Sequence, residues 1–242
     1  MKTAKPNSLT DTYPMRINKY LAHKGIATRA GVDELITRGK VTINGRKALL
    51  GDKVLEKDVV EVRGVHHKKK NVYLAYNKPR GIVTANPQGN EKDILKSLKF
   101  PAGVFPVGRL DKDSHGLIIL TSDRRVTDRL LNPLYKHKKE YEVEVDRRFT
   151  PAFVKHMQEG VDIGGYVTKP ATVSKISDTT FTITLTEGKN RQIRRMTEKL
   201  GYTVRDLKRI RIQNIKLENI PQNSYREISG SELEEFLKGL GL

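Results

Sequence analysis

The spacing of apolar residues near the start of the chain predicts a small unit of two helices and short strands. Apolar residues recur at helical spacing from Met15, so we expect one helix ending at Gly25 and a second, capped by Thr28, stopping near Gly39. An alternating strand with an Asn-Gly turn follows over 41–46, and a further strand over 59–62 closes the unit.

The rest of the chain alternates mainly with the period of β-strands. We expect strands at 72–76, 117–120, 138–145, 171–176, 181–186 and 210–217, and helices at 126–131, 151–158, 193–200 and after a Ser231 cap. The fold class predicted is α+β, with a mixed, mainly antiparallel sheet flanked by helices. The expected organisation is a flexible tail (1–14), a small domain (15–62), a basic linker (63–71) and a large domain (72–242).

The charge balance indicates a polyanionic partner. Lys and Arg number 46 against 28 for Asp and Glu, which gives a formal net charge of +18. No run approaches the roughly 18 apolar residues of a membrane span, so we expect no membrane partner. The chain has no cysteine, which excludes disulfides and a cysteine nucleophile, and its six histidines show no metal-binding spacing. These features favour a cytoplasmic protein without a metal.

One loop is a candidate for chemistry. It runs from Val107 to Leu117 and places two carboxylates, Asp111 and Asp113, beside Arg109 and ahead of a buried strand. The residues could also be simple turn formers. A calcium loop is excluded by Ser122, which stands where the bidentate glutamate of such a loop is expected.

Two groups of basic residues are candidates for contact with nucleic acid. In the small domain they lie along and beside the two expected helices: Arg16, Lys19, Arg29, Arg38 and Lys40. Singly, such residues are more often solvated helix faces. In the large domain, a strand, a Glu187-Gly188 turn and an arginine-rich helix start follow one another, and together they predict an electropositive mouth suited to a phosphate backbone.

The small domain resembles the S-four-type RNA-binding domain. The resemblance rests on Arg16-Ile17-Asn18-Lys19-Tyr20-Leu21, Thr28-Arg29 and the Gly39 to Gly45 segment. One departure is Ala30-Gly31, where the family usually shows a basic and an acidic residue. The resemblance implies RNA binding, and by itself it does not imply an enzyme.

Four motifs in order resemble the RsuA/RluF-type pseudouridine synthases, over nearly the whole length of the chain. They are Asn77-Lys78-Pro79-Arg80-Gly81, Gly108-Arg109-Leu110-Asp111, Lys139-Glu140-Tyr141 and Asn190-Arg191-Gln192-Ile193-Arg194-Arg195-Met196. The resemblance implies a catalytic domain over 72–242 and a cofactor-independent isomerase. The amino-acid sequence around Asp111 is most similar to that of the RluF branch. This similarity implies large-subunit (23S) ribosomal RNA as substrate and a transfer RNA stem-loop as a second candidate. We expect a monomer.

The same resemblance implies the roles of individual residues. Asp111 would act at the ribose of the target uridine, as nucleophile or as base, with Arg194 paired to it. Tyr141 would stack on the uracil, and Arg109 would fill the space left by the extruded nucleotide. Lys78, Arg191 and Arg195 would bind RNA.

Two other classes of function fit the sequence less well. A non-catalytic RNA-binding protein would explain the charge and the small domain, but not the set of Asp111, Tyr141 and Arg194. A nuclease or methyltransferase would need a metal-binding carboxylate cluster or a glycine-rich cofactor loop, and the sequence has neither.

Overall fold

The computed structural model describes residues 13–63 and 71–242. The chain forms two compact units, one made mainly of residues up to Asn71 and one that begins at Val72. Most of the expected tail (1–12) and most of the expected linker (64–70) lie outside the described residues. No helix in the described part is long and apolar enough to cross a membrane.

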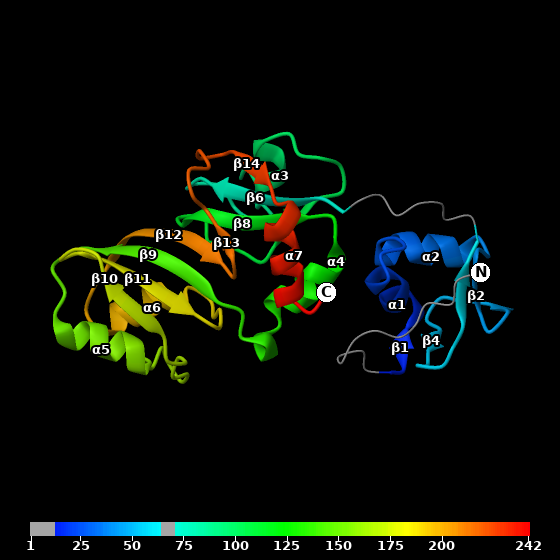
Figure 1. The fold of residues 1–242 in the computed structure, drawn as a ribbon, viewed down its shortest axis with the longest axis horizontal. Helices are drawn as coiled ribbons and strands as arrows, with labels where there is room; N and C mark the ends of the chain where they lie inside the picture. Colours follow the sequence, from blue (N-terminus) through cyan, green and yellow to red (C-terminus); the bar gives the residue numbers. More distant parts are fainter. Residues whose placement is uncertain (1–12, 64–70) are drawn as a thin grey trace. The chain divides into compact units, whose positions relative to one another are not determined.

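The first unit packs two helices against short strands (Figure 1). Its elements are β1 (Met15–Arg16), α1 (Ile17–His23), α2 (Arg29–Thr37), β2 (Val41–Ile43), β3 (Arg46–Lys47), β4 (Lys53–Val54) and β5 (Val60–Val62). As expected, Thr28 caps α2, since its hydroxyl accepts a hydrogen bond from the Gly31 amide at 2.8 Å. Asn44 and Gly45 both have positive φ, the backbone of a tight hairpin turn between β2 and β3.

The second unit is built on one large sheet (Figure 1). Its main path runs β10-β11-β9-β12-β8-β6-β14, with β13 beside β12 and β7 beside β8. The strands are β6 (Tyr73–Lys78), β7 (Phe105–Val107), β8 (His115–Thr121), β9 (Lys139–Val145), β10 (Thr172–Lys175), β11 (Thr180–Leu185), β12 (Val204–Ile212), β13 (Ile215–Lys216) and β14 (Tyr225–Glu227). Among these pairs, β8 and β12 are parallel and the others antiparallel. The prediction of a mixed, mainly antiparallel sheet is confirmed.

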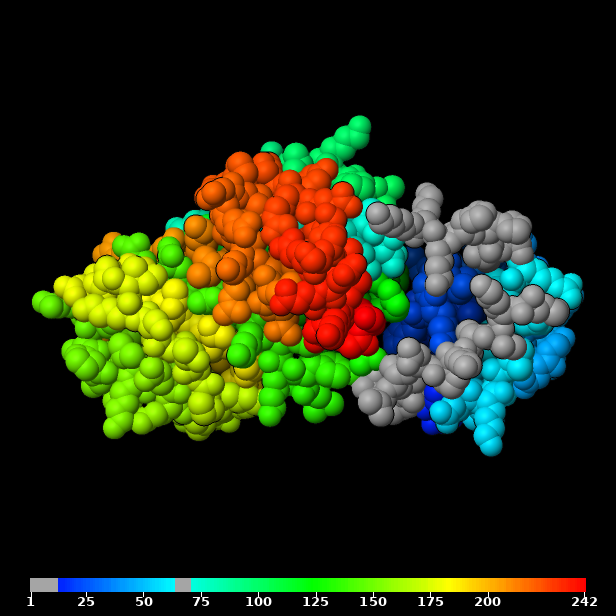
Figure 2. Space-filling model, in the orientation of Figure 1, coloured from blue at the N-terminus to red at the C-terminus, as the bar shows by residue number. Residues whose placement is uncertain are grey.

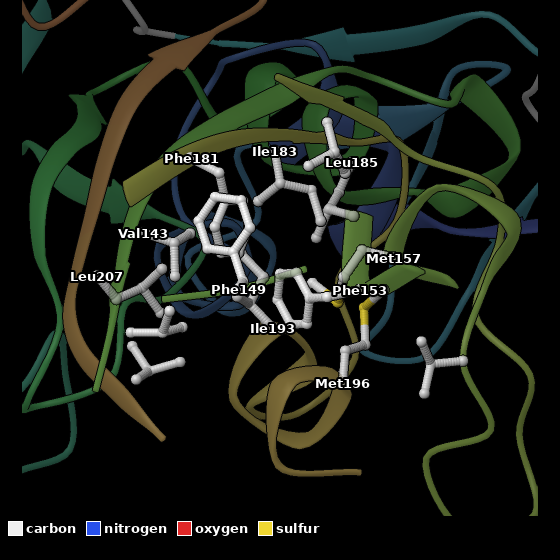
Figure 3. Packing of buried hydrophobic residues seen from close by; sticks show 14 of the residues in the cluster. Val143, Phe149, Phe153, Met157, Phe181, Ile183, Leu185, Ile193, Met196 and Leu207 are labelled. Atoms are coloured by element: carbon white, nitrogen blue, oxygen red, sulfur yellow. The ribbon is translucent and has the colours of Figure 1, made fainter. Parts of the chain in front are cut away.

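Helices cover both ends of this sheet. One apolar core joins α5 (Pro151–Glu159) and α6 (Gln192–Lys199) to β9, β11 and β12, with Phe149, Phe153 and Phe181 at its centre (Figure 3). A second core joins α4 (Arg124–Leu131) and α7 (Gly230–Gly239) to β6 and β8, and α3 (Ile94–Ser97) packs with a third cluster. A short 3₁₀ turn, η1 (Pro133–Tyr135), connects α4 to β9. The segment from β12 to α7 forms a continuous strip of surface, orange to red in Figure 2.

Two local predictions are wrong. The strand expected at 210–217 is a hairpin, because Gln213 adopts positive φ between β12 and β13. The Ser231 cap is also wrong, because α7 begins at Gly230 and the extended Ser229 occupies the cap position.

The parallel pair of β8 and β12 has one close contact that shapes the site. Gly116 lies opposite Arg209 and has a φ of +102°. A Cβ atom at Gly116 would lie 2.4 Å from the Arg209 carbonyl oxygen, so only glycine fits there. This approach brings Arg209 beneath the loop that carries Asp111 and Asp113.

Candidate active site

Asp111 lies in the loop between β7 and β8, at the edge of a cavity of about 470 Å³. Arg109, Tyr141 and Arg191 line the same cavity, so the structure brings together four of the residues that the sequence indicated. Part of the remaining wall is apolar: Leu130, Leu185, Ile193, Leu207 and Ile212. The cavity therefore offers a carboxylate and cations beside surfaces suited to a flat ring.

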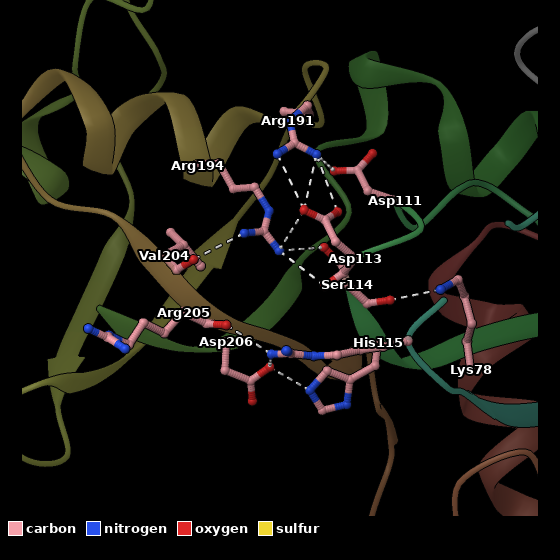
Figure 4. A network of polar contacts seen from close by, with 11 residues as sticks. Lys78, Asp111, Asp113, Ser114, His115, Arg191, Arg194, Val204, Arg205 and Asp206 are labelled. Carbon is pink, nitrogen blue, oxygen red and sulfur yellow. Dashed lines mark hydrogen bonds and ion pairs between the residues drawn. The ribbon is translucent and has the colours of Figure 1, made fainter. Parts of the chain in front are cut away.

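Arg191 is the arginine that faces Asp111. Its Nη1 atom lies 3.8 Å from Oδ2 of Asp111 and 3.2 Å from Oδ1 of Asp113 (Figure 4). Arg191 precedes α6 and has a φ of +46°, a left-handed backbone that is uncommon for arginine. This conformation is part of what sets the direction in which the guanidinium leaves the helix start.

Arg194 pairs with Asp113, and the expected pairing with Asp111 is wrong. Its Nη2 atom lies 3.4 Å from Oδ2 of Asp113 and donates to the Asp113 carbonyl and the Ser114 hydroxyl, while Nη1 donates to the Val204 carbonyl. Burial raises the pKa of Asp113, but the hydrogen bond from Arg191 and the charge of Arg194 outweigh it and lower the pKa. The Arg194 side chain is only 14% exposed. It thus ties the loop that carries Asp111 and Asp113 to β12.

Lys78 is placed differently from the prediction of direct RNA contact. The residue is fully buried at the end of β6, and its ammonium donates to the carbonyls of Pro79 and Ser114 at 2.9 and 2.8 Å. Burial lowers the pKa of Lys78 to about 8, against the opposing charges of Asp113 and Asp111. Lys78 therefore holds the end of the Asp111–Ser114 loop, and RNA cannot reach this buried side chain.

Tyr141 lies on the cavity wall at the edge of the first apolar core. It stands opposite Arg209 in the antiparallel pair of β9 and β12, with the Arg209 guanidinium 6.0 Å from the ring centroid. Lys139 lies two residues before Tyr141 and also lines the cavity. Lys139 belongs to the Lys139-Glu140-Tyr141 motif, but neither it nor Arg209 was predicted as a site residue, although an alternating strand places Lys139 and Tyr141 on one face.

Glu187 organises the start of α6. This buried carboxylate accepts hydrogen bonds from the Tyr166 hydroxyl at 2.6 Å, the Lys169 amide at 3.0 Å and the Gln192 side chain at 3.0 Å. The Gln192 side chain in turn accepts from the Lys189 amide. Glu187 thus fixes the turn from which Arg191 reaches the two aspartates.

A further polar group joins β12 to the turn after β6. The Asp206 carboxylate accepts from His115 Nε2 at 2.8 Å and from the Arg80 guanidinium (Figure 4). Burial raises the pKa of Asp206, but these hydrogen bonds and charges outweigh it and lower the pKa. Arg80 therefore ties its turn to β12.

The remaining candidate RNA contacts fall into two sets. Arg195 lies outside the cavity lining, and its guanidinium donates to the Ile163 carbonyl. The first unit carries its set at the surface: Arg16, Arg29, Arg38 and Lys40 are exposed, and Lys19 is partly exposed. Arg38 forms an ion pair with Glu34 at 2.6 Å, which partly neutralises its charge. Within 13–63 and 71–242, no three His, Asp or Glu side chains form a cluster that could hold a metal ion.

Comparison with known proteins gives concordant matches in both units. Residues 72–199 match the family model described as RNA pseudouridylate synthase, and residues 15–60 match the S4 domain. The chain is 42% identical over 234 residues to the dual-specificity RNA pseudouridine synthase RluF of Salmonella typhi, covering 95% of this chain and 81% of that protein.

Other relatives extend the similarity. The chain is 31% identical over 229 residues to the ribosomal large subunit pseudouridine synthase B of Bacillus subtilis (strain 168), covering 90% of this chain and 94% of that protein. Among solved structures, a crystal structure of a pseudouridylate synthase superposes with a TM-score of 0.68 at 27% identity. That match covers 91% of this chain and 99% of the other.

Proposed function

Because the chain belongs to the RNA pseudouridylate synthase family and is therefore an isomerase acting on RNA, we propose that it converts a uridine of 23S ribosomal RNA into pseudouridine at Asp111. A transfer RNA stem-loop is a second proposed substrate. The named relatives supporting this choice are a dual-specificity RNA pseudouridine synthase and a ribosomal large-subunit enzyme. From such substrates we infer a cytoplasmic protein.

The observation that carries the proposal is the shared cavity of Asp111 and Tyr141. A uracil stacked on Tyr141 would be held between the ring and the apolar wall. Its ribose would then lie toward the loop, where the Asp111 carboxylate can meet the sugar. Arg191, 3.8 Å from that carboxylate, helps to orient it toward the sugar.

The chemistry requires a bond exchange at carbon 1′ of the ribose. The bond from carbon 1′ to N1 breaks, and its electron pair stays on the uracil. Asp111 assists either by attacking carbon 1′ or by removing the neighbouring sugar proton. The uracil then turns within the cavity, and carbon 5 bonds to carbon 1′. On the first route the bond from Asp111 to carbon 1′ breaks in this step, and on the second route Asp111 returns the sugar proton. The carbon 5 proton leaves, and N1 takes up a proton. Substrate and product have the same atoms, so the reaction needs no oxidant or reductant.

Access to a paired uridine requires that the nucleotide leave its helix. Arg109 lines the same cavity as Asp111 and would occupy the vacated space. The exposed cations Arg16, Arg29 and Lys40 of the first unit would bind phosphates of the same RNA.

The test is release of tritium from carbon 5-labelled 23S ribosomal RNA, 16S ribosomal RNA and bulk transfer RNA. Wild type should release tritium from 23S RNA, and Asp111→Asn should release none while binding RNA with unchanged affinity. Asp128→Asn, which changes an exposed carboxylate on α4, is the matched control and should keep wild-type turnover. Turnover by Asp111→Asn would refute the role of Asp111, and release from a different RNA alone would refute the substrate.

A further inference from the structure

The face of β9 that carries Tyr141 also carries a cation at the cavity. Side chains two residues apart on a strand point to the same face, so Lys139 and Tyr141 are neighbours, and both line the cavity. Glu140 points to the opposite face, where it accepts from Arg211 Nε at 2.6 Å. Lys139 is therefore placed at the edge of any ring stacked on Tyr141.

The Lys139 ammonium has few partners of its own. Its described hydrogen bond is a long one, 3.4 Å to the His137 carbonyl. Within residues 13–63 and 71–242, no carboxylate lies within 4.0 Å of its Nζ atom. The two cavity-lining carboxylates are engaged elsewhere, Asp111 with Arg191 and Glu187 with its three donors. A mostly buried ammonium without a counter-charge points to a group that arrives with the substrate.

Two neighbouring side chains add unused donors to the same wall. Arg209 is 3% exposed, and its Nη2 atom is buried without a hydrogen-bond partner among the described residues. His137 Nε2 is likewise buried without one, while its Nδ1 contacts the Gln213 amide. Both residues line the cavity beside Lys139. This part of the cavity wall thus presents positive charge and N–H groups.

The position of these donors identifies the part of the substrate that they meet. Cations suited to phosphates lie at the exposed rim, as Arg191 does with its side chain 45% exposed. Lys139 is mostly buried beside the aromatic ring, where the base would lie. Resting on the proposed placement of uracil on Tyr141, we propose that Lys139 is a further catalytic residue that donates to a carbonyl oxygen of the target uracil and stabilises the base as an anion.

The need for such a cation does not depend on how Asp111 acts. Whether Asp111 attacks carbon 1′ or removes the neighbouring proton, the bond from carbon 1′ to N1 breaks with its electron pair on the uracil. The negative charge spreads over N1 and the two carbonyl oxygens. A preorganised ammonium at one of these oxygens stabilises the charge as it develops, and Lys139 keeps its proton throughout.

The protonation of Lys139 supplies a readout that packing alone would not give. Burial and the charge of Arg209 lower the pKa of Lys139 to about 8. The other charged or titratable groups along the cavity are Arg109, Asp111, His137, Tyr141, Glu187, Lys189 and Arg191. Replacing Lys139 leaves those groups in place, so the ratio of wild-type to variant rate isolates the contribution of Lys139.

The experiment measures single-turnover tritium release and RNA affinity for wild type, Lys139→Met and Lys139→Arg across pH. We expect Lys139→Met to lower the chemical rate about 10²-fold at neutral pH, as for loss of one donor to a developing anion, with RNA affinity unchanged. Above about pH 8 the ratio should shrink toward one, because wild type loses the same charge. Lys139→Arg keeps the charge and should recover part of the rate.

The matched control is Lys138→Met, which removes an exposed lysine next in the chain and should keep the wild-type rate. Thermal unfolding checks that each variant is folded. If Lys139→Met does not fold, the charge-retaining Lys139→Arg is compared with wild type instead. A rate ratio that is independent of pH, or a loss seen only in RNA affinity, would overturn the role of Lys139. Failure of wild type to turn over RNA would instead refute the proposed function.

Discussion

Arg191 lies with its Nη1 atom 3.8 Å from Oδ2 of Asp111, and the same guanidinium also contacts Asp113. One arginine thus joins the two carboxylates of the loop, while Arg194 holds Asp113 from the buried side. Arg191 and Arg194 are three residues apart in the sequence, but they have different roles. The exposed one faces the cavity and the buried one fixes the loop to β12.

Substitution separates these two roles. Arg191→Gln should change the free energy of unfolding by no more than about 1 kcal/mol, since its side chain is 45% exposed. It should lower single-turnover rate about 10²-fold by misplacing Asp111. Arg194→Gln should cost about 2–4 kcal/mol of stability, because it leaves Val204 and Ser114 without their donor. Urea unfolding and tritium release measure both.

Equal losses of stability in Arg191→Gln and Arg194→Gln would contradict this division. Lys99→Gln, which changes an exposed lysine after α3, controls for the loss of one positive charge. It should keep both the stability and the turnover of wild type.

Gly116→Ala should strongly destabilise the second unit. Its methyl group would meet the Arg209 carbonyl at 2.4 Å, at a φ of +102°. We expect a loss of more than about 3 kcal/mol, combining backbone strain and separation of β8 from β12. Gly81→Ala has positive φ but open space, so strain alone should cost about 1–2 kcal/mol. Equal losses in urea unfolding would count against the close approach of the strands.

The local pattern of apolar and polar residues was sufficient to predict much of the fold. The predicted strands at 138–145, 171–176 and 181–186 and the helix at 151–158 match β9, β10, β11 and α5 to within about two residues. In each of these strands apolar and polar residues alternate clearly, and in the helix the apolar residues recur at helical spacing. The hairpin of β12 and β13 was missed because its turn at Gln213 contains no glycine or proline, so the apolar pattern runs through it.

The site was predicted less completely because its geometry depends on distant pairing. Asp111, Tyr141 and the arginine-rich helix start could be found from their motifs. The choice between Arg191 and Arg194 depends on the left-handed backbone of Arg191, which no spacing rule indicates. The burial of Arg209 follows from its pairing with Tyr141 across β9 and β12, strands far apart in the sequence.

Lys78 makes stability depend on pH above neutrality. Its pKa in the folded protein is about 8, below the ordinary value of 10.5. Between these values the unfolded chain binds a proton that the folded protein has released, so the free energy of unfolding rises with pH. Lys78→Met should lack this contribution and gain less stability from about pH 7.5 to 9.5, by on the order of 1–2 kcal/mol.

Urea unfolding at several pH values measures the difference in slope, which is independent of the hydrogen bonds that Lys78→Met also removes. Lys199→Met, an exposed lysine at the end of α6, is the control for loss of a charge. Identical pH slopes in wild type and Lys78→Met would show that Lys78 keeps its proton in the folded protein.

The first unit should contribute to RNA affinity through exposed cations, and salt dependence tests this. Arg29 is exposed at the start of α2, whereas Arg38 is paired with Glu34 at 2.6 Å. If Arg29 contacts a phosphate, Arg29→Gln should reduce the slope of log affinity against log salt by about 1. Arg38→Gln should reduce it less, since its charge is already partly neutralised. Titrations of 23S RNA fragments at several salt concentrations give the slopes, and a larger change in Arg38→Gln than in Arg29→Gln would reverse the proposed order.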